Sequence, residues 1–245
     1  MAIARFYVPH LLASGRVELD AAESKHAFGV LRVSVGDPVV VFDGRGNEAK
    51  GSVAIARRGI VAVEVQEPVA SPRVPARSVH LLVALPKGDR QKLMVDMLTQ
   101  LGVGAVTPLI THRGVAQPTE GALHRLERTV IEACKQCGRN LLMQIHPPKS
   151  LSDVAADSAA VGETARMFAH VDDHARPLAT WLADQASSAA ITAAIGPEGG
   201  FTPAEADALQ NAGWQSISLG QRILRVETAA VAIAALTALP ADSEP

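Results

Sequence analysis

A glycine-rich turn at Ile195–Glu205, with the sequence IGPEGGFTPAE, has the residue types best suited to hold a ligand. An apolar strand is predicted to end at Ile195. Thr202, Pro203 and Glu205 then form a complete helix start, with an N-cap, a first-turn proline and a capping box. Open α/β sheets bind ligands at such turns, because glycine lets the backbone approach closely. A tight strand-to-helix turn without a ligand is the alternative.

A second loop, with the sequence GQRILR at Gly220–Arg225, carries two arginines, Arg222 and Arg225, that folding of the loop does not require. Glu227 then opens a helical pattern that is apolar on nearly all sides, which predicts burial in the core or at a subunit contact. Surface arginines that solvate the loop are the alternative. The dinucleotide fingerprint and the P-loop motif are both absent, so nucleotide cofactors bound in those ways are disfavoured.

The chain from residue 73 onwards must position both loops, and it alternates apolar runs with helical patterns. Strands are predicted at 78–86, 106–111, 141–146, 166–172, 189–196 and 216–219. One helical face is predicted to carry Leu93, Met94, Met97, Leu98 and Leu101, and a further helix is predicted at 120–136. Strands that are apolar on both faces and alternate with helices predict an α/β domain built on a parallel sheet.

Residues 1–72 show a different pattern, with short apolar runs bounded by glycine, aspartate and proline. Strands are predicted at 5–8, 38–43, 48–56 and 60–68, with one helix at 23–32. Short strands at this spacing predict a small β-barrel. The proline-containing stretch 69–78 lacks apolar periodicity and is interpreted as a linker, so the predicted domains are 1–72 and 73–245.

The composition is that of a globular protein, with 48% hydrophobic, 20% charged and 3% aromatic residues. The net charge is −2, but residues 1–77 carry +2 and the remainder carries −4. A basic N-terminal part is consistent with RNA contact, although ordinary scatter of surface charge explains it equally well. The sequence has no apolar run of membrane-spanning length and no signal-peptide core, so a cytoplasmic location is expected.

Cys134 and Cys137 form a lone C-x-x-C motif, which could be a redox pair or half of a zinc site with His124 or His146. The motif lies inside a helical pattern, the histidine spacing is irregular, and the sequence has no second C-x-x-C. We therefore predict no metal site. The two cysteines also do not form a disulfide framework, which again favours the cytosol.

The two loop motifs together, GPEGGFTPAE and LGQRILRVETA, resemble the paired signature of the RsmE family. Members of this family are SPOUT-class methyltransferases that modify N3 of uridine in small-subunit (16S) ribosomal RNA. HAFGVLRVSVGDPVVVFDGRG at 26–46 is similar to the family's PUA-like RNA-binding domain. LPKGDRQKLMVDMLTQLGVGAVTPLIT at 85–111 and RTVIEACKQCGR at 128–139 are similar to parts of its catalytic domain. The resemblance therefore covers most of the chain.

The resemblance implies a SPOUT-type parallel sheet with a C-terminal trefoil knot, preceded by a small PUA-like β-barrel domain. The knot loops would hold S-adenosylmethionine (SAM). A homodimer is also implied, with the active site completed across the subunit contact and neither a metal nor a membrane as a partner. The implied cofactor-binding residues are Ala169, His170, Gly196, Glu198, Gly199, Gly200, Leu219, Gly220, Ile223, Leu224 and Arg225.

Methyl transfer from a sulfonium is an in-line displacement, so the protein mainly positions the reactants. Uracil N3 is a good nucleophile only as the anion, and an arginine could stabilise the negative charge on O2 or O4. Arg225 and Arg222 are the candidates, with Glu198 either accepting the proton or holding backbone N–H groups. The hypothesised RNA contacts are Arg5, Lys25, His26, Arg32, Arg45 and Arg139, the last also a possible aid to catalysis.

Two positions depart from the family pattern. Gln221 replaces a proline, and Val226 replaces a threonine whose hydroxyl could cap the last helix. The expected substrate is 16S ribosomal RNA in the assembled small subunit. Two alternatives stay open: a SPOUT enzyme that methylates a ribose 2′-hydroxyl or another RNA base, and a non-catalytic RNA-binding factor.

Overall fold

The computed structural model describes residues 3–11, 13–70, 72, 75, 77–114, 118–157, 164–172, 174–186 and 188–238. The chain forms two compact units. The first contains Met1–Val74 and Ile131–Leu142, and the second contains Pro75–Val130 and Met143–Pro245. The first unit thus includes a segment that the predicted boundary at residues 72 and 73 assigns to the second domain.

Two contacts show why Ile131–Leu142 belongs to the first unit. The ammonium group of Lys135 lies 2.8 Å from Glu23 Oε1, and both side chains are largely buried. The side-chain amide of Asn140 donates a hydrogen bond to the carbonyl oxygen of Gly46. Burial raises the pKa of Glu23. The hydrogen bond and the positive charge of Lys135 lower this pKa, but they do not cancel the rise.

The first unit is built on a six-stranded sheet in the order β1-β3-β4-β5-β2, with β6 beside β4. β1 and β3 are parallel, and the other pairs are antiparallel. Apolar side chains such as Phe6, Val41 and Val63 form its core. The strands are β1 (Ala4–Tyr7), β2 (Gly15–Glu18), β3 (Pro38–Phe42), β4 (Asn47–Arg57), β5 (Ile60–Val65) and β6 (Val69–Ala70).

Three features of this unit differ from the prediction. β6 lies in the stretch 69–78 that was predicted to be a linker, because its two residues pair with β4. β2 lies outside the predicted strands, because its sequence GRVE holds only one large apolar residue. The helix predicted at 23–32 is two elements: α1 (Ala21–His26) and the π-helical turn η1 (Ala27–Leu31). Arg32 follows with a φ of 54°, in the left-handed region. A π turn cannot be read from apolar spacing, because it adds only a single wider turn to a helix.

The second unit contains an eight-stranded sheet in the order β10-β8-β7-β13-β11-β14-β12, with β9 beside β8. Every pairing is parallel, which confirms the predicted parallel sheet. The strands are β7 (Ser78–Val83), β8 (Ala105–Ile110), β9 (Gln144–Ile145), β10 (Lys149–Ser150), β11 (Thr164–Ala169), β12 (Arg176–Pro177), β13 (Ala190–Ile195) and β14 (Gln215–Ser218).

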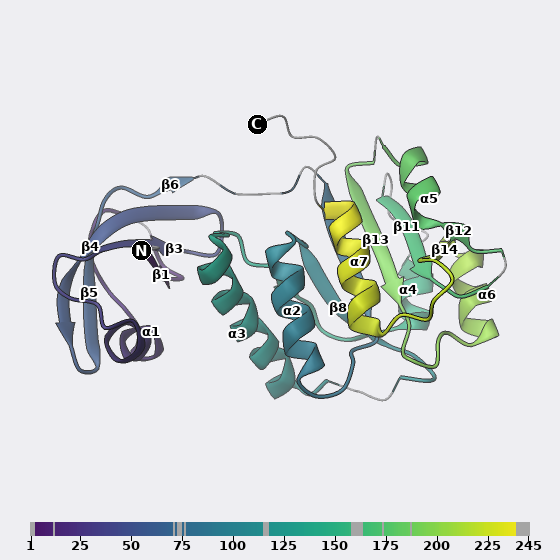
Figure 1. Ribbon diagram of the computed structural model, residues 1–245, viewed down its shortest axis with the longest axis horizontal. Coiled ribbons are helices and arrows are strands. Elements are labelled where there is room, and N and C mark those ends of the chain that lie inside the picture. Colours follow the sequence, from purple (N-terminus) through teal and green to yellow (C-terminus); the bar gives the residue numbers. More distant parts are fainter. Residues whose placement is uncertain are drawn as a thin grey trace. The chain divides into compact units, whose positions relative to one another are not determined.

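Helices cover both faces of this sheet (Figure 1). On one face α7 packs against α2 and against β7 and β13. On the other face α4 and α6 contribute to a core cluster with strand residues such as Leu82, Phe168 and Ala194. The helices are α2 (Arg90–Gln100), α3 (Glu120–Cys137), α4 (Leu151–Asp157), α5 (Leu178–Asp184), α6 (Pro203–Asn211) and α7 (Val226–Ala238).

The helical face predicted for α2 is displaced around the helix axis. Leu93 is 55% exposed, although the spacing predicts it to be buried. The buried side chains are instead Met94, Val95, Leu98 and Thr99. Because α2 packs against α7, its buried face is set by a tertiary neighbour. The strand predicted at 141–146 is likewise reduced to the two residues of β9.

Candidate functional site

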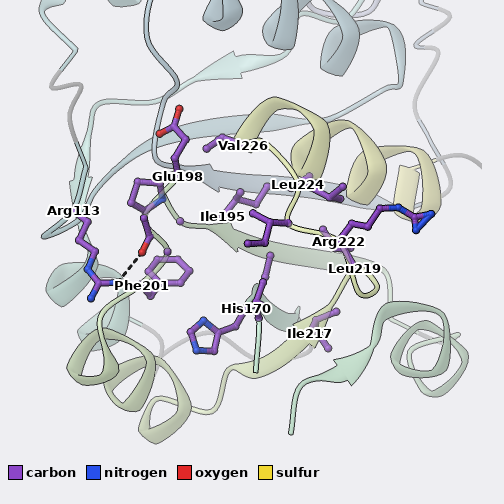
Figure 2. Close-up of a pocket in the computed structure, with 18 of the residues that line it drawn as sticks. Arg113, His170, Ile195, Glu198, Phe201, Ile217, Leu219, Arg222, Leu224 and Val226 are labelled. Carbon is purple, nitrogen blue, oxygen red and sulfur yellow. Dashed lines mark hydrogen bonds between the residues drawn. The ribbon is translucent and has the colours of Figure 1, made fainter. Parts of the chain in front are cut away.

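A cavity of about 320 Å³ opens at the carboxyl end of the parallel strands, and we call it the loop cavity (Figure 2). Its walls come from the loop after β13, the loop after β14, and the end of β11. Ten of the residues predicted to bind a cofactor line it: Ala169, His170, Gly196, Glu198, Gly199, Gly200, Leu219, Gly220, Ile223 and Leu224. Arg222 also lines it, whereas Arg225 lies outside the lining.

The glycine turn after β13 is held by a well-capped helix. The Thr202 side chain accepts a hydrogen bond from the Glu205 backbone N–H, and Glu205 accepts one from the Thr202 backbone N–H, so the predicted capping box is confirmed. Gly200 has a φ of +68°, a conformation that favours glycine. A Cβ at Gly196 would lie 3.2 Å from the Phe201 ring, so the turn passes close to that buried side chain.

The loop after β8 braces the same turn. Arg113 Nη1 donates a hydrogen bond of 2.7 Å to the carbonyl oxygen of Gly199, and the backbone N–H of His112 donates to Glu205 Oε1 at 2.8 Å. Burial would raise the pKa of Glu205, but these donors and those of Thr202 outweigh it and lower the pKa. Arg113 is a site residue that the sequence reasoning missed. Its position just after a strand, at the ligand-binding edge of the sheet, is the signal that could have found it.

Glu198 forms an ion pair with Arg90. Arg90, at the start of α2, places Nη2 3.3 Å from Glu198 Oε1 and Nη1 3.6 Å from Glu227 Oε1. Glu227 is buried, and its Oε2 finds no hydrogen-bond donor among the described residues. Arg90 therefore links the glycine turn, α2 and α7 through charge, a role that the linear sequence did not indicate.

The loop after β14 forms another wall of the loop cavity and carries an exposed apolar side chain. Gly220 has a φ of +103°, and the side chain of Ile223 is 82% exposed at the cavity wall. Val226 is buried and lines the cavity, so the residue that replaces the family's threonine supplies an apolar wall. Gln221 is exposed and lies outside the lining. The two departures from the family pattern thus fall on one apolar wall position and one surface position.

The loop cavity combines apolar walls with polar backbone. Ile195, Ile217 and Leu224 face it from three segments, while the glycine turn presents peptide groups unobstructed by side chains (Figure 2). Such a lining fits SAM, whose adenine ring needs apolar walls and whose polar ends need hydrogen-bond partners. The charged residues of the lining are Arg113, Arg222 and Glu198.

The predicted RNA contacts all lie in the first unit, and they differ in exposure. Lys25, Arg32 and Arg45 are exposed, and His26 is half-buried. Arg5 and Arg139 are mostly buried. Arg5 pairs with Glu48 at 3.1 Å and lies over the Phe42 ring. Arg139 is 6% exposed, and burial lowers its pKa. Direct RNA contact is therefore better supported for the exposed residues than for these two arginines.

The cysteines do not form a metal centre with other described residues. Cys134 is buried and Cys137 is exposed. Burial raises the pKa of the Cys134 thiol to about 12, so it stays protonated near neutral pH. The described part of the chain contains no group of three or more His, Cys, Asp or Glu side chains that could hold a metal ion.

Among the helices of the described residues, none has the length and apolar character that crossing a membrane requires.

Comparisons with known proteins define the class. Residues 73–238 match the RNA methyltransferase domain family, and residues 19–66 match the PUA domain family of RNA methyltransferases. The chain is thus an α/β RNA methyltransferase with an N-terminal PUA-like domain.

Individual relatives define the family. The ribosomal RNA small subunit methyltransferase E of Synechocystis sp. is 31% identical over 98% of this chain and 78% of that protein. Its Rickettsia conorii counterpart is 30% identical over 93% of this chain and 91% of that protein. The chain belongs to the ribosomal RNA small subunit methyltransferase E (RsmE) family.

Two solved structures share the fold over nearly the whole chain. The ribosomal RNA small subunit methyltransferase E of Neisseria gonorrhoeae, bound to S-adenosyl methionine, superposes with a TM-score of 0.86 at 28% identity, covering 96% of both chains. A Legionella pneumophila protein in complex with SAM superposes with a TM-score of 0.88 at 27% identity, covering 97% of both chains.

Proposed function

We propose that the protein transfers a methyl group from SAM to N3 of a uridine in small-subunit (16S) ribosomal RNA. The observation that carries the proposal is the joint lining of one cavity by the two motif loops. The relatives named above methylate small-subunit ribosomal RNA according to their names, and two structural neighbours hold SAM. A ribosomal substrate also agrees with a cytoplasmic place of action.

The cofactor site consists of the ten predicted residues that line the loop cavity, together with Arg225 beside it. Bound SAM supplies a methyl group activated by a positive sulfur. The glycine turn gives it backbone hydrogen-bonding groups, and Ile195, Ile217 and Val226 exclude water from its apolar part. Arg113 keeps the turn in place by binding the carbonyl oxygen of Gly199.

A C-terminal trefoil knot accounts for how both loops reach one cavity. β14 is separated from β13 by β11 in the sheet, yet the chain returns after β14 so that α7 packs on β7 and β13. The loop at 219–225 must therefore cross back past the glycine turn.

A homodimer completes the proposed site. Ile223 is 82% exposed although it lines the cavity, and Leu93 and Leu236 on the packed helices α2 and α7 are also exposed. Exposed apolar side chains at a cavity wall and on two packed helices fit burial by a second copy of the chain. The partner would then supply the missing wall.

Arg225 and Arg222 are the proposed catalytic arginines. Arg222 lies in the cavity lining, where its charge could stabilise the negative oxygen of the uridine anion. Arg225 lies outside the lining. It would therefore contact the base only if the bound RNA or the partner subunit brings the base close to it. Glu198 is tied to Arg90 at 3.3 Å, which favours a positioning role over proton transfer.

The first unit is proposed as the RNA-binding part. The proposed domains are 1–72 and 73–245, and Ile131–Leu142 of the second domain belongs to the first unit. Lys25, Arg32 and Arg45 present charge to solvent, as contact with backbone phosphates requires. The uridine must leave its stack before N3 can be reached, at a cost of a few kcal/mol. Phosphate contacts made by this unit would offset that cost.

Methylation of purified small subunits that lack the modification tests the proposal. With labelled SAM and nucleoside mass spectrometry, the product should be 3-methyluridine, and free ribosomal RNA should react more slowly than assembled subunits. An Arg225→Ala variant should lose turnover while keeping most of its RNA affinity. A ribose-methylated product, or SAM binding without any turnover on either substrate, would contradict the proposal.

A further inference from the structure

One short segment of the first unit is buried at both of its ends and exposed between them. Ala27 and Val33 belong to the core cluster of the six-stranded sheet. The backbone N–H groups of Arg32 and Val33 both donate to the carbonyl oxygen of Ala27, which closes the π-helical turn η1. Residues 28–32 are all exposed. The buried ends therefore fix the conformation of a turn whose side chains face solvent.

Three of these exposed residues have large apolar side chains. Phe28 is 39% exposed, Val30 is 68% exposed, and Leu31 is also exposed. Val35, two residues after the buried Val33, is exposed as well. Single apolar side chains on a surface need no explanation, but several that gather on one segment mark a site of interaction.

Phe28 differs in exposure from every other aromatic residue of the chain. The sequence has five phenylalanines, one tyrosine and two tryptophans, and all of them are among the described residues. Six are buried and Tyr7 is half-buried, so Phe28 is the single exposed one. Packing of the two cores accounts for the buried rings, but it does not account for a ring that is left in contact with solvent.

The side chains beside Phe28 carry positive charge. Lys25 precedes Phe28 by three residues and Arg32 follows it by four, and these are the spacings of neighbours on a helical turn. Both cations are exposed, and neither forms an ion pair with another described residue. The ring therefore lies between two positive charges that have no partner within the described chain.

The carboxylates nearby do not neutralise these two cations. Residues 24–36 contain no acidic side chain. Glu23 is buried and pairs with Lys135, and Asp37 accepts a hydrogen bond from the backbone of its own loop. β5 packs against α1, and its exposed Glu64 pairs with Arg16. The exposed turn is therefore left with positive charge.

An exposed ring between two cations suits the chemistry of unpaired nucleotides. Every base has an aromatic face that stacks on a phenylalanine ring, and the phosphates on either side of the base attract positive charge. A duplex offers its phosphates but keeps its base faces covered, so it leaves the ring without a partner. Two copies of this surface facing each other would bring like charges together, which disfavours self-association.

We propose that the turn surface, which consists of Phe28, Val30 and Leu31 with Lys25 and Arg32, binds single-stranded RNA. One unpaired base stacks on the Phe28 ring, while Lys25 and Arg32 contact the phosphates on either side. The inference rests on the proposed RNA substrate, but it does not depend on which atom of the RNA receives the methyl group. It identifies an unpaired segment as the part of the RNA that the first unit contacts.

Fluorescence anisotropy on the full chain without SAM tests the proposal with two probes. One is a labelled single-stranded RNA of about ten nucleotides, and the other is the duplex of the same strand with its complement. Phe28→Ala should weaken the single strand about 5- to 30-fold, because it removes the stacking surface. The same change should weaken the duplex less than about twofold, because a duplex does not use the ring.

Two further variants locate the effect at the ring. Phe28→Tyr keeps an aromatic face and should bind the single strand within about twofold of the unchanged protein. Val69→Ala is the matched control, because Val69 is another exposed apolar residue of the first unit. It lies on β6, beside β4 and apart from α1 (Figure 1), and its substitution should have no effect.

The salt dependence of binding separates stacking from charge. Arg32 has a φ of 54°, and asparagine tolerates this conformation, so Arg32→Asn removes the charge without a new backbone strain. It should reduce the slope of log Kd against log salt concentration by about 0.7, the value for one phosphate contact on a single strand. Phe28→Ala should leave the slope unchanged.

The proposal is overturned if Phe28→Ala, shown to be folded by its circular dichroism, binds the single strand as tightly as the unchanged protein. It is also overturned if this variant weakens the duplex as much as the single strand. A changed mass of the unliganded variant in sedimentation, with RNA affinity unaltered, would assign the surface to contact between copies of the chain instead.

The failure of this inference and that of the proposed function are distinguishable. RNA binding that depends on Phe28, without formation of 3-methyluridine, would contradict only the proposed function. Formation of 3-methyluridine by Phe28→Ala with an unchanged KM for the RNA would contradict only the role of the turn surface.

Discussion

The loop cavity and the strand cavity, a second cavity of about 630 Å³ lined by side chains of β7, β8, β11 and β13, lie in the same unit. They share β11 and β13, but they are built differently. The loop cavity is shaped by loop backbone, with glycines at positive φ and peptide groups left open. The strand cavity is shaped by side chains at alternate positions of regular strands. A backbone-built site leaves a local signature of glycines and caps, whereas a site built from strand side chains becomes apparent only when the strands are aligned.

The largest expected effect concerns Phe201, the buried side chain against which the glycine turn packs. Phe201 is 3% exposed, and its ring meets the Phe168 ring edge-on at 5.9 Å. Phe201→Ala should lower the free energy of unfolding by about 3–5 kcal/mol, because it removes a buried ring. Urea denaturation measures the loss, and calorimetry should show that SAM binding is lost as well.

Phe201→Leu is the control for this change. It keeps a buried apolar side chain, so it should cost less than about 1.5 kcal/mol and retain SAM binding. Unaltered SAM affinity in the Phe201→Ala variant would show that the glycine turn keeps its shape without the Phe201 ring.

The second prediction concerns pH and the strand cavity. The pKa of His80 is about 4 in the folded protein, below the ordinary value of 6.5, so the folded state binds fewer protons between these values. Neutral His80 therefore contributes fully to the free energy of unfolding above about pH 6.5, and this contribution is lost as the pH falls towards 4. At pH 5 the free energy of unfolding should be lower by about 2 kcal/mol.

Denaturation of the unchanged protein and of His80→Gln at pH 7 and pH 5 measures this loss. The variant has no imidazole to protonate, so the difference in stability between the two proteins should shrink or reverse at pH 5. A difference that is the same at both pH values would show that His80 titrates normally and is not enclosed by the strand cavity.

The third prediction separates backbone conformation from contact in the loop cavity. Gly220 has a φ of +103°, and a Cβ there would meet nothing within 4 Å. Gly220→Ala should therefore strain only the backbone, by about 1–2 kcal/mol, and weaken SAM about 5- to 30-fold as the loop relaxes.

Gly121→Ala is the matched control. Gly121 is exposed in α3, and a Cβ there also meets nothing within 4 Å. The same change should stabilise this helix by about 0.5–1 kcal/mol and leave SAM affinity unchanged. Equal effects of the two substitutions on SAM binding would argue against a backbone-built site.

The smallest expected effect concerns the charges behind the loop cavity. Arg90→Met should lower the free energy of unfolding by about 1 kcal/mol, because it leaves the buried carboxylate of Glu227 without its ion pair. Glu198→Gln removes only the more exposed pair and should cost less than about 0.5 kcal/mol. Thermal unfolding compares the two variants. A larger loss of stability for Glu198→Gln would show that the Arg90–Glu198 pair, and not the Arg90–Glu227 pair, contributes more to stability.

The sequence predicted most of the strands and the location of the loop cavity. Thr202 and Glu205 cap α6 as expected, and ten predicted residues line the loop cavity. Arg113 and Arg90 were missed, because each reaches the glycine turn from a segment far away in the chain. The strand cavity was missed for a related reason: no single strand shows that Arg166, Thr192 and His80 form one row.

What the sequence by itself determined is local: a glycine turn, a capped helix, an arginine-containing loop and strands that are apolar on both faces. These features depend on interactions between residues a few positions apart, or on periodicity along one element. The tertiary structure decided the register of the parallel strands, the buried face of α2, and the partners of Glu198 and Glu227. Those outcomes depend on contacts between distant segments, which form only when the sheet and its helices pack together.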